Sequence, residues 1–121
     1  MTSKWSIESA RTTGSSHLKE SVPCQDHYSV IKSSDKKWTA ACISDGAGSA
    51  KHSEISSKIV ADLFSTALIN LGNGITQDGP GAWVNDFIID QIIGIRKKLR
   101  ELNATAELDD YHCTLVGLLI G

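Results

Sequence analysis

The stretch WTAACISDGAGS, residues 38–49, decides the fold, because a strand-like run of apolar and small residues leads directly into a carboxylate and two glycines. Residues 38–44 are predicted to form a buried strand that delivers Asp45 at its end. Gly46 and Gly48 allow the backbone to come close to a ligand. Oxygen ligands suit Mg²⁺ or Mn²⁺, and Mg²⁺ usually takes only one or two protein carboxylates and fills its shell with waters. The stretch therefore predicts a strand end that holds a hard cation.

A second carboxylate stands at the end of a neighbouring predicted strand. Asp26 closes a polar loop and precedes a strand over residues 27–32, and a hairpin loop at residues 33–35 connects that strand to the one over residues 37–44. The two aspartates are therefore expected to lie close together. Simpler interpretations remain open at this point, since Asp45 and Gly46 also make a favoured turn dipeptide and Asp26 could cap a loop through an Asx-turn.

The remaining elements are predicted from hydrophobic periodicity. Residues 5–10 alternate as a half-buried strand, residues 53–71 form a helix stopped by the glycines at 72 and 74, residues 78–80 start a second helix that ends near Asn103, and residues 111–120 form a buried strand. The apolar stripe of the first helix is Ile55, Ile59, Leu63, Ala67 and Leu71, widened by Val60, Phe64 and Leu68, and that of the second is Val84, Phe87, Ile88, Ile92, Ile95, Leu99 and Leu102. This order predicts an α+β fold in which helices cover one face of an antiparallel sheet.

Bulk composition excludes several classes of function. The 121 residues make at most one domain, and a net charge of −2 gives no reason to expect nucleic acid or an anionic membrane as a partner. Three widely spaced cysteines favour a reducing compartment over a disulfide scaffold, and no stretch is apolar and long enough for a signal peptide or a bilayer span. The sequence predicts a cytoplasmic protein.

Other site chemistries fit the sequence less well. The loop at residues 46–49 could bind a phosphate through its backbone amides, but it lacks the third glycine of a dinucleotide fingerprint and the lysine of a P-loop. A zinc site would start from the pair Cys24 and His27, but structural zinc usually takes two such close pairs, and the further ligands would have to come from scattered positions. Those positions are His17, Cys42 and His52. His112 and Cys113 are neighbours in a predicted strand and point to opposite faces, which argues against a nucleophile with its base.

The motifs, taken in their order, resemble the N-terminal half of the metal-dependent protein phosphatases (the PPM or type 2C family), especially its compact bacterial members. A tryptophan-containing first strand leads to GSSH at residues 14–17 and to PCQD at residues 23–26. The motif ISDGAGSA at residues 43–50 precedes a long helix, and CTLVGLLI at residues 113–120 resembles the family's next core strand. The match runs through nearly the whole chain.

The resemblance implies a fold and a chemistry. The family's fold is a sandwich of two antiparallel β-sheets flanked by helices, with a two-metal site between the sheets. Asp45 would bridge two Mn²⁺ or Mg²⁺ ions, the backbone carbonyl of Gly46 would bind one of them, and Asp26 would act through metal-bound waters. A metal-activated water would then hydrolyse phosphoserine or phosphothreonine in a phosphoprotein substrate.

Two departures from the family pattern bear on activity. Many members carry a phosphate-binding arginine five positions before the equivalent of Asp26, and here that position is Ser21; His17 or Lys19 could substitute. The family's remaining metal aspartates belong to a C-terminal half with no counterpart in residues 1–121. We therefore expect a partial phosphatase domain that is inactive on its own. The alternative is a non-catalytic, phosphatase-like interaction module that pairs with a partner chain through an open sheet edge.

Overall fold

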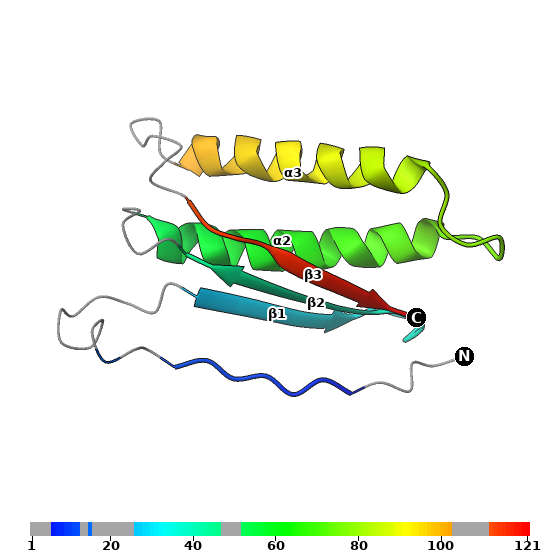
Figure 1. The fold of residues 1–121 in the computed structure, drawn as a ribbon, viewed down its shortest axis with the longest axis horizontal. Helices are drawn as coiled ribbons and strands as arrows, with labels where there is room; N and C mark the ends of the chain where they lie inside the picture. Colours follow the sequence, from blue (N-terminus) through cyan, green and yellow to red (C-terminus); the bar gives the residue numbers. More distant parts are fainter. Residues whose placement is uncertain (1–5, 13–14, 16–25, 47–51, 103–111) are drawn as a thin grey trace.

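A three-stranded antiparallel sheet with two long helices on one face forms the body of the protein (Figure 1). The computed structural model describes residues 6–12, 15, 26–46, 52–102 and 112–121. The elements are β1 (Asp26–Lys32), β2 (Thr39–Asp45), α2 (Ser53–Gly74), α3 (Trp83–Leu102) and β3 (Val116–Ile120), and the strand order in the sheet is β1-β2-β3. Helix α2 packs on the sheet, and α3 lies beside α2 and antiparallel to it. The predicted α+β class and antiparallel sheet are confirmed.

The β1–β2 hairpin is held by its loop. The N–H of Ser33 donates to the carbonyl of Trp38 at 2.9 Å, and the N–H of Trp38 donates to the hydroxyl of Ser33 at 3.0 Å. The carboxylate of Asp35 accepts from the Ser33 hydroxyl at 2.6 Å and from the N–H of Lys37 at 3.0 Å. Both hydrogen bonds lower the pKa of Asp35 from its ordinary value, and the bond from the Ser33 hydroxyl has the larger effect.

Alternate residues of β2 meet different surroundings. Ala40, Cys42 and Ser44 are buried beneath α2, whereas Ile43 is 60 % exposed on the opposite face. The prediction of a buried strand is therefore wrong for one of the two faces, because a single layer of helices covers only one side of the sheet. Burial raises the pKa of the Cys42 thiol to about 11, so this cysteine stays protonated at neutral pH.

Helix α2 contacts the sheet through small residues. The predicted apolar stripe is largely confirmed, with Ile55, which is 41 % exposed, as its exception. Four serines also take positions under the sheet. The buried residues of α2 are Ser53, Ser56, Ser57, Val60, Ala61, Phe64, Ser65, Ala67, Leu68, Leu71 and Gly72. Three of these serine hydroxyls donate to backbone carbonyls three residues earlier in the helix, which satisfies them inside the core. Hydrophobic periodicity missed the buried serines because serine does not count as apolar.

The glycines after Leu71 serve packing and do not end the helix where the sequence predicts. Helix α2 continues to Gly74, and a Cβ on Gly72 would lie 2.7 Å from the indole ring of Trp38. The second helix also begins later than predicted, at Trp83. Residues 76–79 instead form a turn closed by a 2.9 Å hydrogen bond from Gly79 N–H to the Thr76 carbonyl, with Gly79 at φ +84°.

Two predictions near the C-terminus need correction. Ile92 and Leu102 of the expected α3 stripe are exposed, because the side of α3 that meets α2 is centred on Ile95 and Leu99. The last strand starts at Val116; Tyr111 lies outside the described residues, and residues 112–115 contribute only an isolated bridge. The strand is not buried throughout, because Val116 and Leu118 face away from the helices and are exposed.

The predicted first strand is not formed in its described part. Residues 6–12 carry no strand assignment and run alongside the sheet, on the side away from α2 (Figure 1). Alternation of apolar and polar residues indicates an extended segment with one apolar side, but a strand also needs a hydrogen-bonded neighbour. The described residues contain one sheet, so the second sheet of the expected sandwich is not seen in them.

We expect Gly72→Ala to lower the free energy of unfolding by about 1–3 kcal/mol, because the new methyl group would overpack against the rigid indole of Trp38. Gly94→Ala is the matched control in α3, where a Cβ meets nothing within 4 Å. It should raise stability by up to about 1 kcal/mol through helix propensity. Urea unfolding of both variants followed by circular dichroism measures the difference, and an equal effect of the two substitutions would contradict the packing role of Gly72.

We expect Asp35→Ala to destabilise the hairpin at neutral pH and to have little effect in acid. The pKa of Asp35 is lowered in the folded state, so its contribution is present above the ordinary value of 3.8 and is lost as pH falls through the folded-state pKa. Urea unfolding of wild type and variant at neutral pH and in acid should show the two curves converging in acid. A difference independent of pH would show that the carboxylate is not the group responsible.

Candidate metal site

Asp26 and Asp45 are direct cross-strand partners at one end of the sheet. The antiparallel register pairs Asp26 with Asp45, Tyr28 with Ile43, and Val30 with Ala41. Side chains of opposed residues share a face, with Cβ atoms about 5 Å apart. Both carboxylates therefore lie on the face away from α2, at the end of an apolar row. The prediction that the two aspartates end neighbouring strands is confirmed.

The backbone at Asp45 is fixed by Thr114, 69 residues later in the chain. The N–H of Asp45 donates to the Thr114 hydroxyl at 3.1 Å, and the N–H of Thr114 donates to the Asp45 carbonyl at 2.8 Å. The hydroxyl of the buried Ser44 donates to the Thr114 carbonyl at 2.7 Å. Asp45 is thus tied on one side to β1 and on the other to the segment that leads into β3.

Gly46 extends this ladder by one residue. It forms an isolated antiparallel bridge with Cys113. The N–H of Thr114 donates to the carbonyl of Asp45 and not to that of Gly46. The alternative of a simple turn at this dipeptide would involve the residues that follow Gly46. Residues 47–51 lie outside the described part of the chain.

The donor set fits a hard divalent cation. Two carboxylates and one backbone carbonyl offer only oxygen ligands, and Mg²⁺ commonly takes one or two protein carboxylates with waters in its other positions. No group of three or more histidine, cysteine, aspartate or glutamate side chains gathers within the described ranges. Cys42 is buried under α2, and Cys24 and His17 lie outside those ranges, so the zinc alternative gains no support.

A basic side chain reaches the same end of the sheet from the N-terminal segment. Arg11 Nη1 donates to the backbone carbonyl of Asp26 at 2.8 Å and lies 3.2 Å from His27 Nδ1. The other ring nitrogen of His27, Nε2, is 3.6 Å from a carboxylate oxygen of Asp62 on α2. Three elements that are distant in sequence therefore converge beside the first residue of β1.

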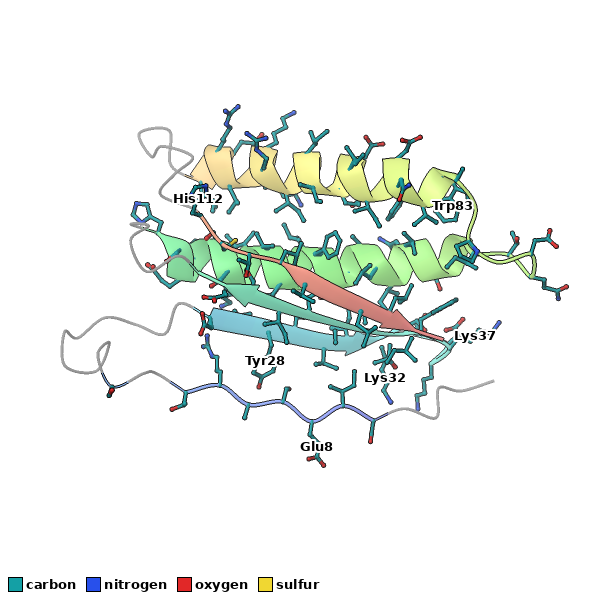
Figure 2. All side chains as sticks on the ribbon, in the orientation of Figure 1. Glu8, Tyr28, Lys32, Lys37, Trp83 and His112 are labelled. Carbon is teal, nitrogen blue, oxygen red and sulfur yellow. The ribbon has the colours of Figure 1, made fainter. Side chains whose placement is uncertain are left out.

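A cavity of about 460 Å³ separates the N-terminal segment from the open face of the sheet. Its apolar lining includes Ile7, Tyr28, Val30, Ala41 and Ile43, and Figure 2 shows Tyr28 directed from β1 toward this segment. Arg11, Asp26 and His27 also line the cavity. The cavity is thus apolar along the strands and charged where β1 begins.

Sequence reasoning found the carboxylates and missed the residues that surround them. His17, Lys19 and Ser21, the positions considered for phosphate binding, lie outside the described residues. The sequence did not predict that Arg11 and Thr114 contact the aspartates, nor that His27 lies beside Arg11. Thr114 stands in a run that resembles a core strand, and Arg11 stands in a polar segment, so no local pattern marked either of them.

Comparison with known proteins identifies one family. The sequence profile described as Protein phosphatase 2C matches residues 13–121. No curated protein and no solved structure matches the chain significantly. Within the described residues, neither long helix has the length and apolar character needed to cross a membrane.

We expect Thr114→Val to lower the free energy of unfolding by about 1 kcal/mol, because the N–H of Asp45 loses its hydroxyl acceptor. Thr114→Ser retains the acceptor and should be close to wild type. Thr66→Val is a matched control on α2, where the hydroxyl donates within its own helix, and it should change stability by no more than about 0.5 kcal/mol. Equal losses for the valine and serine variants at position 114, measured by urea unfolding, would contradict this role.

Proposed function

Because this chain belongs to the protein phosphatase 2C family, we propose that it is part of a metal-dependent phosphatase domain that hydrolyses phosphoserine and phosphothreonine in phosphoproteins. The observation that carries the proposal is the cross-strand pairing of Asp26 with Asp45 on the open face of the sheet. Paired carboxylates at a strand end, with a glycine carbonyl next in the chain, are a donor set for Mn²⁺ or Mg²⁺.

Each residue has a distinct role in the proposed site. Asp45 would hold the ions through its carboxylate and Gly46 through its backbone carbonyl, and Asp26 would act on them through water. When bound, the ions would supply an activated water and neutralise charge that develops on the phosphoryl group. Thr114 hydrogen-bonds to the backbone of Asp45, so the place of this residue at the strand end is fixed.

The exposed face of the sheet supports the proposal that residues 1–121 are one part of a larger sandwich domain. Ile43, Val116 and Leu118 are 60 %, 66 % and 55 % exposed. The strand register places all three on the face opposite α2, together with Tyr28 and Val30. Burial of apolar surface contributes about 25 cal/mol per Å², so an uncovered row of this kind favours a second layer. We propose that a second sheet, supplied by the rest of the domain, covers this face.

The same exposed face favours a second candidate function. In a phosphatase-like interaction module, a partner chain would cover the row of Ile43, Val116 and Leu118 or pair with an edge strand, and the aspartates would not bind metal. Both candidates require the open face to be covered. They differ in what Asp45 does, and the difference can be measured without turnover.

We expect the chain to bind Mn²⁺ and Asp45→Asn to weaken that binding about a hundredfold, since loss of a direct ligand should cost at least as much as loss of an outer-shell partner. Asp90→Asn, an exposed aspartate on α3, removes the same charge elsewhere and should bind like wild type. Isothermal titration calorimetry with Mn²⁺ measures all three proteins. Hydrolysis of a phosphoserine peptide is assayed in parallel.

The outcomes separate the two candidates. Mn²⁺ binding that depends on Asp45 but not on Asp90 supports the phosphatase site, whether or not the chain turns over substrate by itself. Unchanged binding in Asp45→Asn, or no binding by wild type, would reject the metal site and favour the interaction module.

A further inference from the structure

The side of α3 that faces away from α2 carries an apolar centre between two regions of opposite charge. Ile95 and Leu99 are buried and mark the side toward α2. The opposite side, which we call the outer face of α3, is formed by exposed residues that recur at helical spacing: Asp86, Ile89, Asp90, Ile93, Lys97 and Arg100. Figure 2 shows oxygen-tipped side chains near the beginning of α3 and nitrogen-tipped ones near its end, on the side away from α2.

The helix dipole explains only part of this charge order. A carboxylate in the first turn and a cation in the last turn complement the dipole, and Asp86 and Arg100 have those places. The effect falls off within the terminal turns, whereas Asp90 and Lys97 stand further inside the helix. Asp86 and Asp90 are also like charges four positions apart, which destabilises an isolated helix. The dipole gives no reason for the two isoleucines between the charges.

Those isoleucines form the apolar centre of the outer face. Ile89 and Ile93 are 54 % and 58 % exposed, although both are large apolar side chains on a helix that buries other isoleucine and leucine side chains against α2. The second sheet of the proposed phosphatase domain would cover the face of the sheet opposite α2, so it does not account for them. An apolar centre with a charged rim is typical of a surface that binds another protein.

We propose that the outer face of α3 binds the same face of a second copy of this chain, with the two helices antiparallel. A twofold axis makes an interface self-complementary, because the same surface patch is used by both copies. With Ile93 at the axis, opposite Ile93 of the second copy, Asp86 of each chain lies opposite Arg100 of the other, since the two residues are equally far from Ile93 along the helix. By the same geometry Asp90 lies opposite Lys97.

The order of the charges favours a second copy over an unrelated chain. Each copy presents an acidic half and a basic half, and these are complementary only when the helices are antiparallel. A parallel pair would bring like charges together, which is strongly disfavoured across an interface. Exposed ion pairs contribute little affinity but fix orientation and register, so the apolar contact must come from Ile89 and Ile93. One helix from each copy makes a small interface, and we expect a weak, salt-sensitive dimer.

Sedimentation velocity over a concentration series tests the proposal. We expect wild type to be in a monomer–dimer equilibrium that shifts toward monomer as salt is added. Asp86→Arg combined with Asp90→Lys makes the outer face basic throughout. Lys97→Asp combined with Arg100→Asp makes it acidic throughout. Each double variant should weaken self-association at least about a hundredfold through repulsion of like charges. An equimolar mixture of the two should form a heterodimer, because the charges are then complementary again.

A pair of isoleucine variants tests which surface is used. Ile93 is 58 % exposed on α3, and Ile43 is 60 % exposed on the open face of the sheet. We expect Ile93→Ser to weaken the dimer at least about tenfold, because each copy loses an apolar side chain at the axis. Ile43→Ser should leave the dimer unchanged. The reverse pattern would show that copies associate through the open face of the sheet, and it would overturn the proposal.

The remaining outcomes are also decisive. A wild-type chain that stays monomeric at every concentration, a dimer that neither charge reversal weakens, or a mixture that does not associate would each reject the proposal. Circular dichroism shows whether the variants fold. If a double variant does not, the milder variants Asp90→Asn and Lys97→Gln replace it, and each should weaken the dimer by a smaller factor. Asp45→Asn should dimerise like wild type, so a failure of the metal site does not affect this test.

Discussion

The register between β1 and β2 is the constraint on which the site depends, because it alone brings Asp26 opposite Asp45. A slip of one residue would send one of the two carboxylates to the face under α2, where burial of a charge is costly. The hairpin loop fixes the register through the paired hydrogen bonds of Ser33 and Trp38. The hydrogen bonds that fix the pairing of the two aspartates therefore lie at the opposite end of the hairpin from the carboxylates.

The face of the sheet toward α2 carries several small residues. Toward α2 the sheet presents small side chains, such as Ser29, Ala40 and Cys42, and Ser29 shares a 2.9 Å hydrogen bond with Ser65 of the helix. Gly117 continues this pattern, since Phe64 and Leu68 lie 3.0 Å from the position of a Cβ there. Small residues let the helix and the sheet approach closely. Ile31 and Leu119 also pack against the core on this side, while Ile43, Val116 and Leu118 are exposed on the other face.

How far the sequence predicts this structure depends on how local each signal is. The aspartates at the strand ends, the hairpin and both long helices follow from patterns within a few residues, and the structure confirms them. The helix ends were predicted less well: Gly72 reads as a stop signal but makes room for Trp38, a contact between segments far apart in the chain. Burial was misjudged for Ile43, because no pattern within one strand tells which faces of a sheet are covered. Arg11 and Thr114 belong to the site through contacts over 15 and 69 residues, which periodicity does not report.

The electrostatics of the strand end connect the fold with the chemistry. Like charges directly opposite each other disfavour an antiparallel pair, and the hydrogen bonds between the Asp45 backbone and Thr114 hold Asp45 in that place. A divalent cation bound at the proposed site would convert this repulsion into attraction, and because it would bind only the folded state it would also stabilise the sheet. Arg11 cannot do the same, because its contact is with the carbonyl of Asp26 and leaves the carboxylates to other partners. The strand end thus combines a pair of carboxylates on the open face of the sheet with a guanidinium that is hydrogen-bonded to the backbone of one of them.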